Sequence, residues 1–253
     1  MYFYFKREEL RTLKNIALLL FLLPAIMVVG QKKKKKKDFP AEFGFQIKPI
    51  IPVNYFGAGE QTFSDSVVDL SLNSKVGMSF GVLIRQKITS KIAVETGISQ
   101  IKRNYIMKGK GTKYGTSDEG SFGYVSYQIP VQGLFYIQLA ERVFMNTTAG
   151  VGVDMYPSSI TSKGDKYLMQ QLTLRQHWIS FSMLANLGVE YRTEKKGTFY
   201  FGFSFNKPFS PIGETTFKYF YKENQSTKMT TFLNGNYLTI DLRFFFPENK
   251  DEK

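Results

Sequence analysis

The feature that most constrains this chain is a strict alternation of bulky apolar and small polar side chains between residues 43 and 246. Segment 76–84 shows it clearly: its even positions hold Val, Met, Phe, Val and Ile, while three of its four odd positions hold Gly or Ser. A period of two residues places successive side chains on opposite faces of a β-strand, whereas a helix requires a period of 3.6. The pattern therefore predicts an all-β fold.

Eight segments carry this alternation, and each is expected to form one strand. Pro130 lies inside the fourth segment, and a proline removes a backbone donor from a sheet, so a β-bulge is expected there. The eight segments are 43–48, 76–84, 92–99, 127–139, 143–154, 179–191, 199–206 and 238–246.

The connections between the segments are of two kinds. Three are only a few residues long, and four run to roughly 20–30 residues. Short turns at one rim and long loops at the other are typical of outer-membrane barrels. We therefore predict a closed antiparallel up-and-down transmembrane β-barrel of about 8 strands, with long extracellular loops and short periplasmic turns. The short connections lie near 87–91, 140–142 and 193–196, and the long ones near 52–74, 102–122, 156–176 and 207–236.

The chemistry of the two faces favours a membrane barrel over a soluble one. The polar face is rich in Gly, Ser, Thr and Asn, which suit the crowded lumen of an eight-stranded barrel. The other face carries Phe, Ile, Val and Leu, which suit lipid. The overall composition, with 43% hydrophobic and 16% aromatic residues, also fits a soluble β-sandwich or lipocalin-like barrel, so a soluble periplasmic barrel remains the rival class.

A few charged residues fall on the face assigned to the lumen. Unpaired buried charge is costly, so these side chains are expected to pair with one another inside the barrel. The predicted lumen network consists of Arg85, Glu95, Glu190, Asp241 and Arg243.

The N-terminal 30 residues have the composition of a secretory signal peptide. Basic residues precede an apolar run at 16–29, and cleavage is expected between Gly30 and Gln31. The alternative is a retained signal anchor, although the run is short for a membrane span. Residues 31–42 are expected to form a disordered, Lys-rich periplasmic arm, and 247–253 a C-terminal tail.

Charge and composition exclude several function classes. Of the formal charge of +13, the signal peptide contributes +2 and Lys32–Lys37 contribute +6. The remainder is a weak basis for nucleic-acid binding, so no nucleic acid is expected as a partner. The chain has no cysteine and one histidine, which excludes disulfides and thiolate metal sites and leaves no metal cluster. No cofactor is expected.

His177 is the one candidate for catalysis, because some outer-membrane barrels are lipid-modifying enzymes with a His–Ser pair. Ser180 lies three residues further along a strand, so the two side chains would point to opposite faces. Ser158 or Ser159 in the preceding connection could supply another nucleophile. We expect instead a rim histidine beside Trp178, within an interfacial aromatic girdle, and no catalytic residue.

Three short stretches resemble the PorT-like family of outer-membrane β-barrel domains. They are Tyr127-Gln-Ile-Pro130, Ala149-Gly-Val-Gly152 and the terminal strand 238–246. The resemblance covers roughly residues 40–246 and implies a bacterial outer-membrane location. One branch of the family is linked to type IX secretion. This chain departs from the pattern in its hexalysine stretch and in the seven residues that follow Phe246.

Three function hypotheses follow, and the favoured one is a non-enzymatic structural or binding barrel that displays surface loops. The second is a small channel, or an accessory subunit of a type IX-like secretion or uptake machine. The third is a lipid-modifying enzyme. Expected partners are outer-membrane lipid and lipopolysaccharide, with an envelope protein as a further candidate. The basic segment 108–113 is expected to be a solvated loop, and contact with lipopolysaccharide phosphates is the alternative.

Overall fold

The computed structural model describes residues 41–53, 59–223 and 225–247, all within one compact unit, Phe39–Lys253. The predicted signal peptide, its cleavage site and residues 31–40 of the predicted arm lie outside the described residues, as do residues 248–253 of the predicted tail. Ala41 and Glu42, the last two residues assigned to the arm, belong instead to the first strand. Across the described residues, no helix has the length and apolar character needed to cross a membrane.

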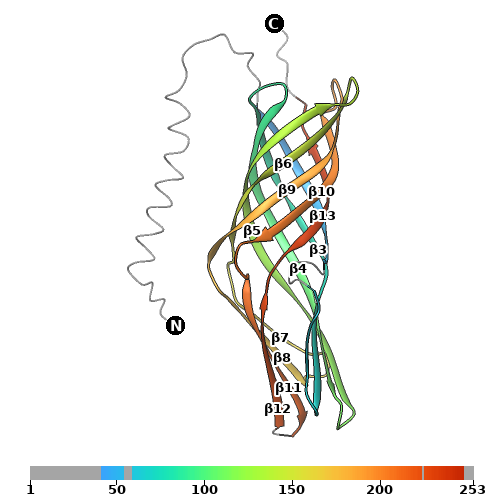
Figure 1. Ribbon diagram of the computed structural model, residues 1–253, viewed down its shortest axis with the longest axis vertical. Coiled ribbons are helices and arrows are strands. Elements are labelled where there is room, and N and C mark those ends of the chain that lie inside the picture. The colour runs from blue at the N-terminus through green and yellow to red at the C-terminus, as the bar shows by residue number, and fades with distance from the viewer. Residues whose placement is uncertain (1–40, 54–58, 224, 248–253) are drawn as a thin grey trace, which may run out of the picture. The chain divides into compact units, whose positions relative to one another are not determined.

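Antiparallel strands account for most of the described residues (Figure 1). In chain order they are β1 (Ala41–Ile51), β2 (Gln61–Ser64), β3 (Val68–Lys87), β4 (Ile92–Gly111), β5 (Thr116–Gln138), β6 (Val143–Met155), β7 (Ile160–Lys163), β8 (Met169–Arg175), β9 (Ile179–Arg192), β10 (Thr198–Pro208), β11 (Gly213–Lys222), β12 (Gln225–Leu233) and β13 (Tyr237–Phe245).

Eight of these strands close into a ring. The order is β1-β3-β4-β5-β6-β9-β10-β13, and every neighbouring pair is antiparallel. The ring closes because β1 pairs on both sides: Phe45 lies opposite Val82 of β3 and opposite Phe244 of β13. The predicted eight-stranded up-and-down barrel is confirmed.

Three tight turns join barrel strands at one rim, as predicted. The amide of Ile88 donates to the carbonyl of Ile92, and that of Leu139 donates to Val143. The third turn closes with the amide of Thr193 donating to Gly197, whose φ of 95° is a conformation that glycine adopts without strain. These turns form one rim of the barrel, which we call the turn rim.

The four long connections lie at the rim opposite the tight turns, as predicted, but they contain further β-strands that the sequence analysis did not identify. β3, β4 and β5 continue beyond the barrel, where β2 pairs with β3. β7, β8, β11 and β12 form a second sheet in the order β12-β11-β8-β7. Together these segments, residues 59–75, 101–125, 156–176 and 209–236, form what we call the extension, at the end of the barrel away from the tight turns (Figure 1).

The extension has its own hydrophobic core between the two sheets. Aromatic rings pack within it: Tyr105 stacks on Phe122 with centroids 5.2 Å apart, and Tyr124 lies 5.7 Å from Tyr156. A core of this size makes the extension an ordered domain rather than a set of loops. The buried members are Val68, Leu70, Leu72, Tyr105, Met107, Phe122, Tyr124, Tyr156, Met169, Ile212, Phe217, Tyr219, Met229 and Leu233.

The chemistry of the strand faces reverses where the barrel meets the extension. On β4 the odd-numbered side chains point inward throughout, but Glu95 inside the barrel is polar whereas Tyr105 inside the extension is aromatic. Outward residues change in the opposite sense, from the exposed Ile98 to the exposed Lys102 and Lys108. Lipid surrounds the barrel and water surrounds the extension, so the apolar face must turn inward on leaving the bilayer.

On β3 a β-bulge accomplishes this reversal. Its register with β4 shifts between Lys75 and Met78. Even-numbered residues are apolar on both sides of the bulge, yet Leu70 is buried in the extension and Phe80 is exposed on the barrel wall. Because the bulge inserts one extra residue, the even-numbered side chains of β3 point inward before it and outward after it.

Pro130 does not produce the bulge that the sequence led us to expect. It lies opposite Gly152 of β6 in an unbroken register. The ladder to β4 passes from the Thr96–Val131 pair to the Ser99–Gln128 pair without a shift. The missing donor therefore leaves a short gap in one ladder, and the strand keeps its alternation.

Asp118 ties the two sheets of the extension together. Its side chain is 4% exposed, and its oxygens accept the backbone amides of Lys166 (2.9 Å), Leu168 (2.8 Å) and Met169 (3.0 Å). Gly164 lies against the carboxylate, where an added Cβ would come within 2.1 Å of Oδ2. One carboxylate on β5 thus fixes the turn between β7 and β8.

Replacing Asp118 with Ala should loosen this turn while leaving the barrel intact. Buried amides that lose their acceptor cost about 1–3 kcal/mol each. Three amides lose Asp118, so we expect a local loss of at least about 3 kcal/mol. Hydrogen exchange should show faster exchange at residues 164–169 and unchanged protection in β9 and β10. The matched control is Asp165→Ala, an exposed side chain; equal protection in both variants would contradict the assignment.

Candidate functional site

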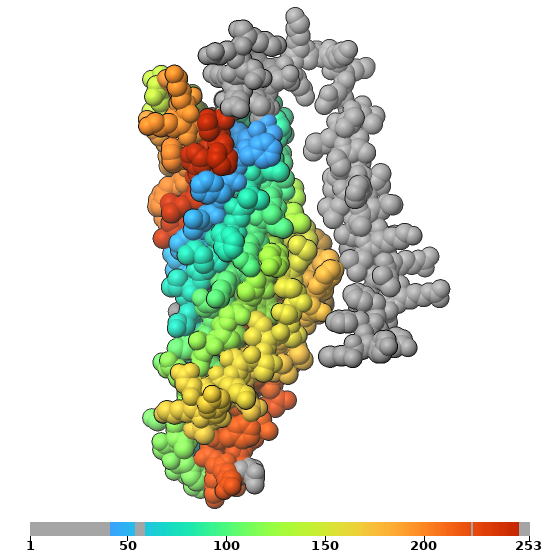
Figure 2. All heavy atoms as spheres, turned by 180° about the vertical axis from the view of Figure 1, so that it is seen from behind, coloured from blue at the N-terminus to red at the C-terminus, as the bar shows by residue number. Residues whose placement is uncertain are grey.

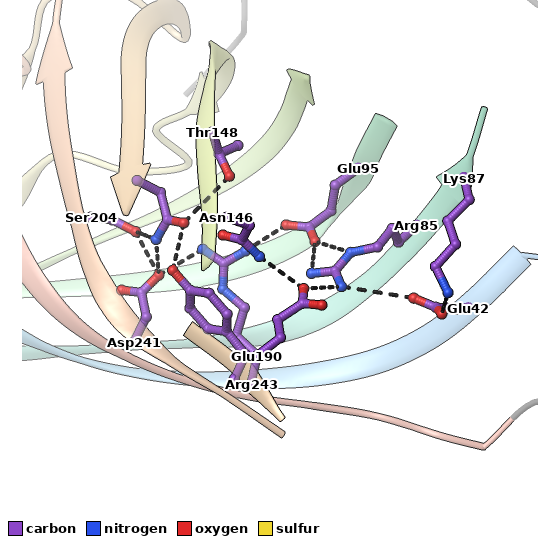
Figure 3. Close-up of polar contacts among 12 residues, drawn as sticks. Glu42, Arg85, Lys87, Glu95, Asn146, Thr148, Glu190, Ser204, Asp241 and Arg243 are labelled. Carbon is purple, nitrogen blue, oxygen red and sulfur yellow. Dashed lines mark hydrogen bonds and ion pairs between the residues drawn. The ribbon is translucent and has the colours of Figure 1, made fainter. Parts of the chain in front are cut away.

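The lumen of the barrel holds a connected network of charged side chains (Figure 3). Arg85 on β3 is fully buried and lies opposite Glu95 of β4. Its Nε and Nη2 donate to Glu95 Oε2 at 3.0 and 2.8 Å, and its Nη1 donates to Oε1 of Glu190 on β9 at 2.5 Å. One guanidinium therefore joins strands from two sides of the ring.

A second guanidinium extends the network along the lumen. Arg243 on β13 donates through Nη1 to Glu95 Oε1 and through Nη2 to Asp241 Oδ2, each at 2.7 Å. Glu95 thus binds both arginines with separate oxygens. Lys48 of β1 reaches Asp241 Oδ2 at 3.2 Å. The hydroxyl of Ser204 donates to the same oxygen at 2.5 Å (Figure 3).

The network continues to the mouth of the barrel at the turn rim. Glu42 pairs with Lys87 and lies 3.7 Å from Arg85 Nη1. Arg192 donates to Glu190 Oε2 through Nε (3.2 Å) and Nη2 (3.0 Å). Because each carboxylate here faces a cation, the charges can stay buried without the full desolvation penalty.

Aromatic rings cover the guanidinium planes. Arg85 lies 3.7 Å from the ring centroid of Phe245, and Arg192 lies 3.9 Å from that of Phe144. Stacking of this kind stabilises a cation that is removed from water. It also fills space near the mouth that water would otherwise occupy.

Small residues on the lumen face make room for this network. Gly188 and Gly202 lie opposite each other on β9 and β10, and a Cβ on either would come within 2.2 Å of the Tyr200 hydroxyl. Tyr200 uses the space to donate to Asn186 Oδ1 at 2.6 Å, while Arg243 lies 4.8 Å from its ring centroid. The glycines noted in the sequence therefore accommodate a large inward side chain.

The structure places all five residues of the predicted lumen network, Arg85, Glu95, Glu190, Asp241 and Arg243, in this one cluster. Sequence reasoning missed four charged members at the strand ends: Lys48, Glu42, Lys87 and Arg192. Extending the alternation by three residues past each segment would identify Lys87 and Arg192, because they follow Arg85 and Glu190 on inward positions. Five cations and four carboxylates leave the network with a net charge of +1.

Side chains fill the lumen above this cluster. A cavity of about 20 Å³ remains, lined by Gln46, Ser99, Asn206 and Thr239 among others. Gln46 Oε1 and both amide atoms of Asn206 are buried without a protein partner. A space of this volume suits about one water molecule, which would satisfy such atoms. The barrel interior is a packed polar core at this level.

The candidate catalytic pair does not come together. His177 is exposed in the bend between β8 and β9, next to Trp178, which is 46% exposed. Ser180 is buried, and its hydroxyl shares a hydrogen bond of 3.0 Å with Ser210. Ser158 and Ser159 are exposed in the connection before β7. Within residues 41–53, 59–223 and 225–247, no group of three or more His, Cys, Asp or Glu could hold a metal ion.

Comparison with known proteins agrees with the barrel geometry. Residues 31–214 match the family model described as outer membrane protein beta-barrel domain. The chain belongs to this family. It is an integral β-barrel of the bacterial outer membrane, with its tight turns in the periplasm and its extension outside the cell.

Comparison with curated proteins and with solved structures gives no further family assignment. No curated protein matches the sequence. Among solved structures, the translocator domain of the autotransporter NalP from Neisseria meningitidis is similar over 93% of this chain and 96% of its own, with 10% identity and a TM-score of 0.31. A likeness at that score supports no conclusion about this barrel.

Replacing Arg85 with Ala should strongly destabilise the barrel, because it leaves Glu95 and Glu190 as buried, undercompensated charges. Breaking a buried ion pair in this way costs about 3–5 kcal/mol. The loss of stability is measured as the change in the free energy of unfolding in urea, with heat-modifiable gel migration in detergent as the readout of folding. The control is Arg142→Ala, which breaks an exposed pair with Glu194 and should cost less than about 1 kcal/mol. Similar losses in both variants would contradict a dominant role for the lumen network.

Proposed function

We propose that this protein is a non-enzymatic outer-membrane barrel that anchors and displays its extension as a binding surface outside the cell. The proposal depends on the contrast between the barrel and the extension. The barrel interior is closed by its own side chains, and the extension is an ordered two-sheet domain with its own core.

The charged network supports an anchoring role rather than transport. Arg85, Glu95 and Arg243 cross the lumen and are each hydrogen-bonded on more than one side. A water-filled path would have to break these contacts and expose buried charges. The small-channel alternative is therefore disfavoured.

The absence of enzymatic activity is part of the proposal, and the geometry around His177 supports it. A nucleophile and its base must lie within hydrogen-bonding reach. Ser180 instead bonds to Ser210, and its side chain is buried while that of His177 is exposed.

Membership of the PorT-like family is proposed on the residues that carry the resemblance. Pro130 and Gly152 are direct partners on β5 and β6, so two of the three stretches form one patch of the barrel wall. An accessory role in a secretion or uptake machine is the second candidate. It is supported by a cleft of about 680 Å³ at the periplasmic mouth, lined by Lys91, Phe144 and Arg192 among others, which an envelope protein could enter.

Outer-membrane lipid and lipopolysaccharide are the proposed surroundings of the barrel wall. Lys75 and Lys102 are exposed just beyond the apolar band, and Lys102 lies opposite Met78 of that band. Cations at this level suit the phosphate groups of the outer leaflet, and they lie nearer the bilayer than the segment 108–113 named from the sequence.

Purified protein reconstituted in a planar bilayer should give no steady ionic conductance, because the lumen is filled by paired side chains. The control is a porin of known conductance, reconstituted from the same detergent and lipid. A reproducible unitary conductance from the wild-type protein would contradict the anchoring proposal and favour the channel.

A further inference from the structure

We propose that the outer face of the sheet β7-β8-β11-β12 binds an extended anionic polysaccharide through a row of lysines. The inference deepens the display function proposed above and rests on it. It names the face of the extension that binds and the chemistry of the ligand.

The row crosses all four strands of the sheet. Lys163 of β7 lies opposite Gln170 of β8, Gln170 lies opposite Lys218 of β11, and Lys218 lies opposite Lys228 of β12. All four side chains are exposed, and Figure 2 shows the segments that carry them, in yellow and orange, side by side on the extension. At a strand spacing of about 4.8 Å, the row is about 14 Å long.

The arrangement is electrostatically unfavourable without a ligand. Like charges directly opposite each other on neighbouring strands are destabilising. Among the described residues, no carboxylate forms an ion pair with Lys163, Lys218 or Lys228. The next acid on the outer face of β11 is Glu214, four residues from Lys218, or about 13 Å at the rise of a strand.

On the opposite sheet of the extension, by contrast, an exposed lysine has a cross-strand carboxylate as its partner. There Lys108 of β4 lies opposite Glu119 of β5, and the two form an ion pair at 3.2 Å. The lysine row lacks acids in the equivalent cross-strand positions. An anionic ligand would supply the missing negative charge.

The protection of sheet edges against pairing with other chains explains only some of the lysines in this row. Lysines on edge strands discourage pairing with other chains, and β7 and β12 are the edges of this sheet. Lys218, however, lies on the inner strand β11, where it adds repulsion and protects no edge.

The groups around the lysines favour a polysaccharide among anionic ligands. Gln170 within the row offers its amide to sugar hydroxyls. In the neighbouring row the hydroxyls of Thr216 and Thr230 share a hydrogen bond of 3.1 Å and offer their remaining donor and acceptor positions. Tyr167, 73% exposed, lies beside Lys163, with its ring centroid 5.8 Å from Nζ. An acidic glycan fits this combination of groups. Its acidic groups would bind the lysines, and its sugar rings and hydroxyls would meet the tyrosine ring and the neutral hydrogen-bonding side chains.

Binding of dextran sulfate to the full-length protein in detergent micelles tests the proposal, with uncharged dextran as the reference ligand. The triple variant K163Q/K218Q/K228Q should bind dextran sulfate about tenfold more weakly, as expected for the loss of three exposed charge contacts. The matched control K108Q/K110Q/K113Q removes the same charge from the β4 side of the extension and should change the affinity less than about twofold.

Folding is monitored separately by heat-modifiable migration. Because the row is self-repelling, the triple variant should be at least as stable as the wild type, and K218Q alone gives a second, milder test with a smaller loss of affinity. Equal losses in the two triple variants, equal binding of uncharged dextran, or no binding of dextran sulfate by the wild type would overturn the proposal. These outcomes do not depend on ionic conductance. Failure of polysaccharide binding is therefore distinguishable from failure of the proposed anchoring function, which the planar-bilayer measurement tests.

Discussion

Three of the eight barrel strands, β3, β4 and β5, pass from lipid into water along their length, and this change of solvent determines which side chains they carry. Within the bilayer the outward residues must be apolar, which leaves the lumen as the place for polar groups. Beyond the bilayer the outward residues must be polar, so the interior becomes apolar. β4 shows both states on a single strand, with Glu95 and Tyr105 pointing inward and Ile98 and Lys102 pointing outward.

Both halves of the molecule follow from this inversion. Polar groups confined to the lumen have no bulk water to bind, so Arg85, Glu95 and Arg243 bind one another and close the barrel. Apolar groups enclosed beyond the bilayer have no lipid to meet, so the long connections pack as two sheets. A filled lumen and an ordered two-sheet extension are therefore consequences of one constraint.

The barrel could be predicted from the sequence because its alternation is local and uninterrupted. The central lumen charges could be predicted for the same reason, since parity alone assigns Arg85 and Glu190 to the inner face. The extension could not, because its apolar residues keep the same even positions on β3 while a bulge between Lys75 and Met78 reverses their direction. Asp118 was missed for a different reason: its partners are backbone amides about 50 residues away, which no spacing in the sequence reveals.

The inversion is tested most directly by single cysteines carrying a polarity-sensitive fluorophore, in a chain that has no native cysteine. Ile98 and Phe135 lie on the outward face of the barrel, and Lys108 and Ser121 lie on the outward face of the extension, on the same two strands. The account predicts hydrocarbon-like emission, quenched by lipid-borne quenchers, at the first two positions and water-like emission at the others. The same environment at all four positions would contradict it.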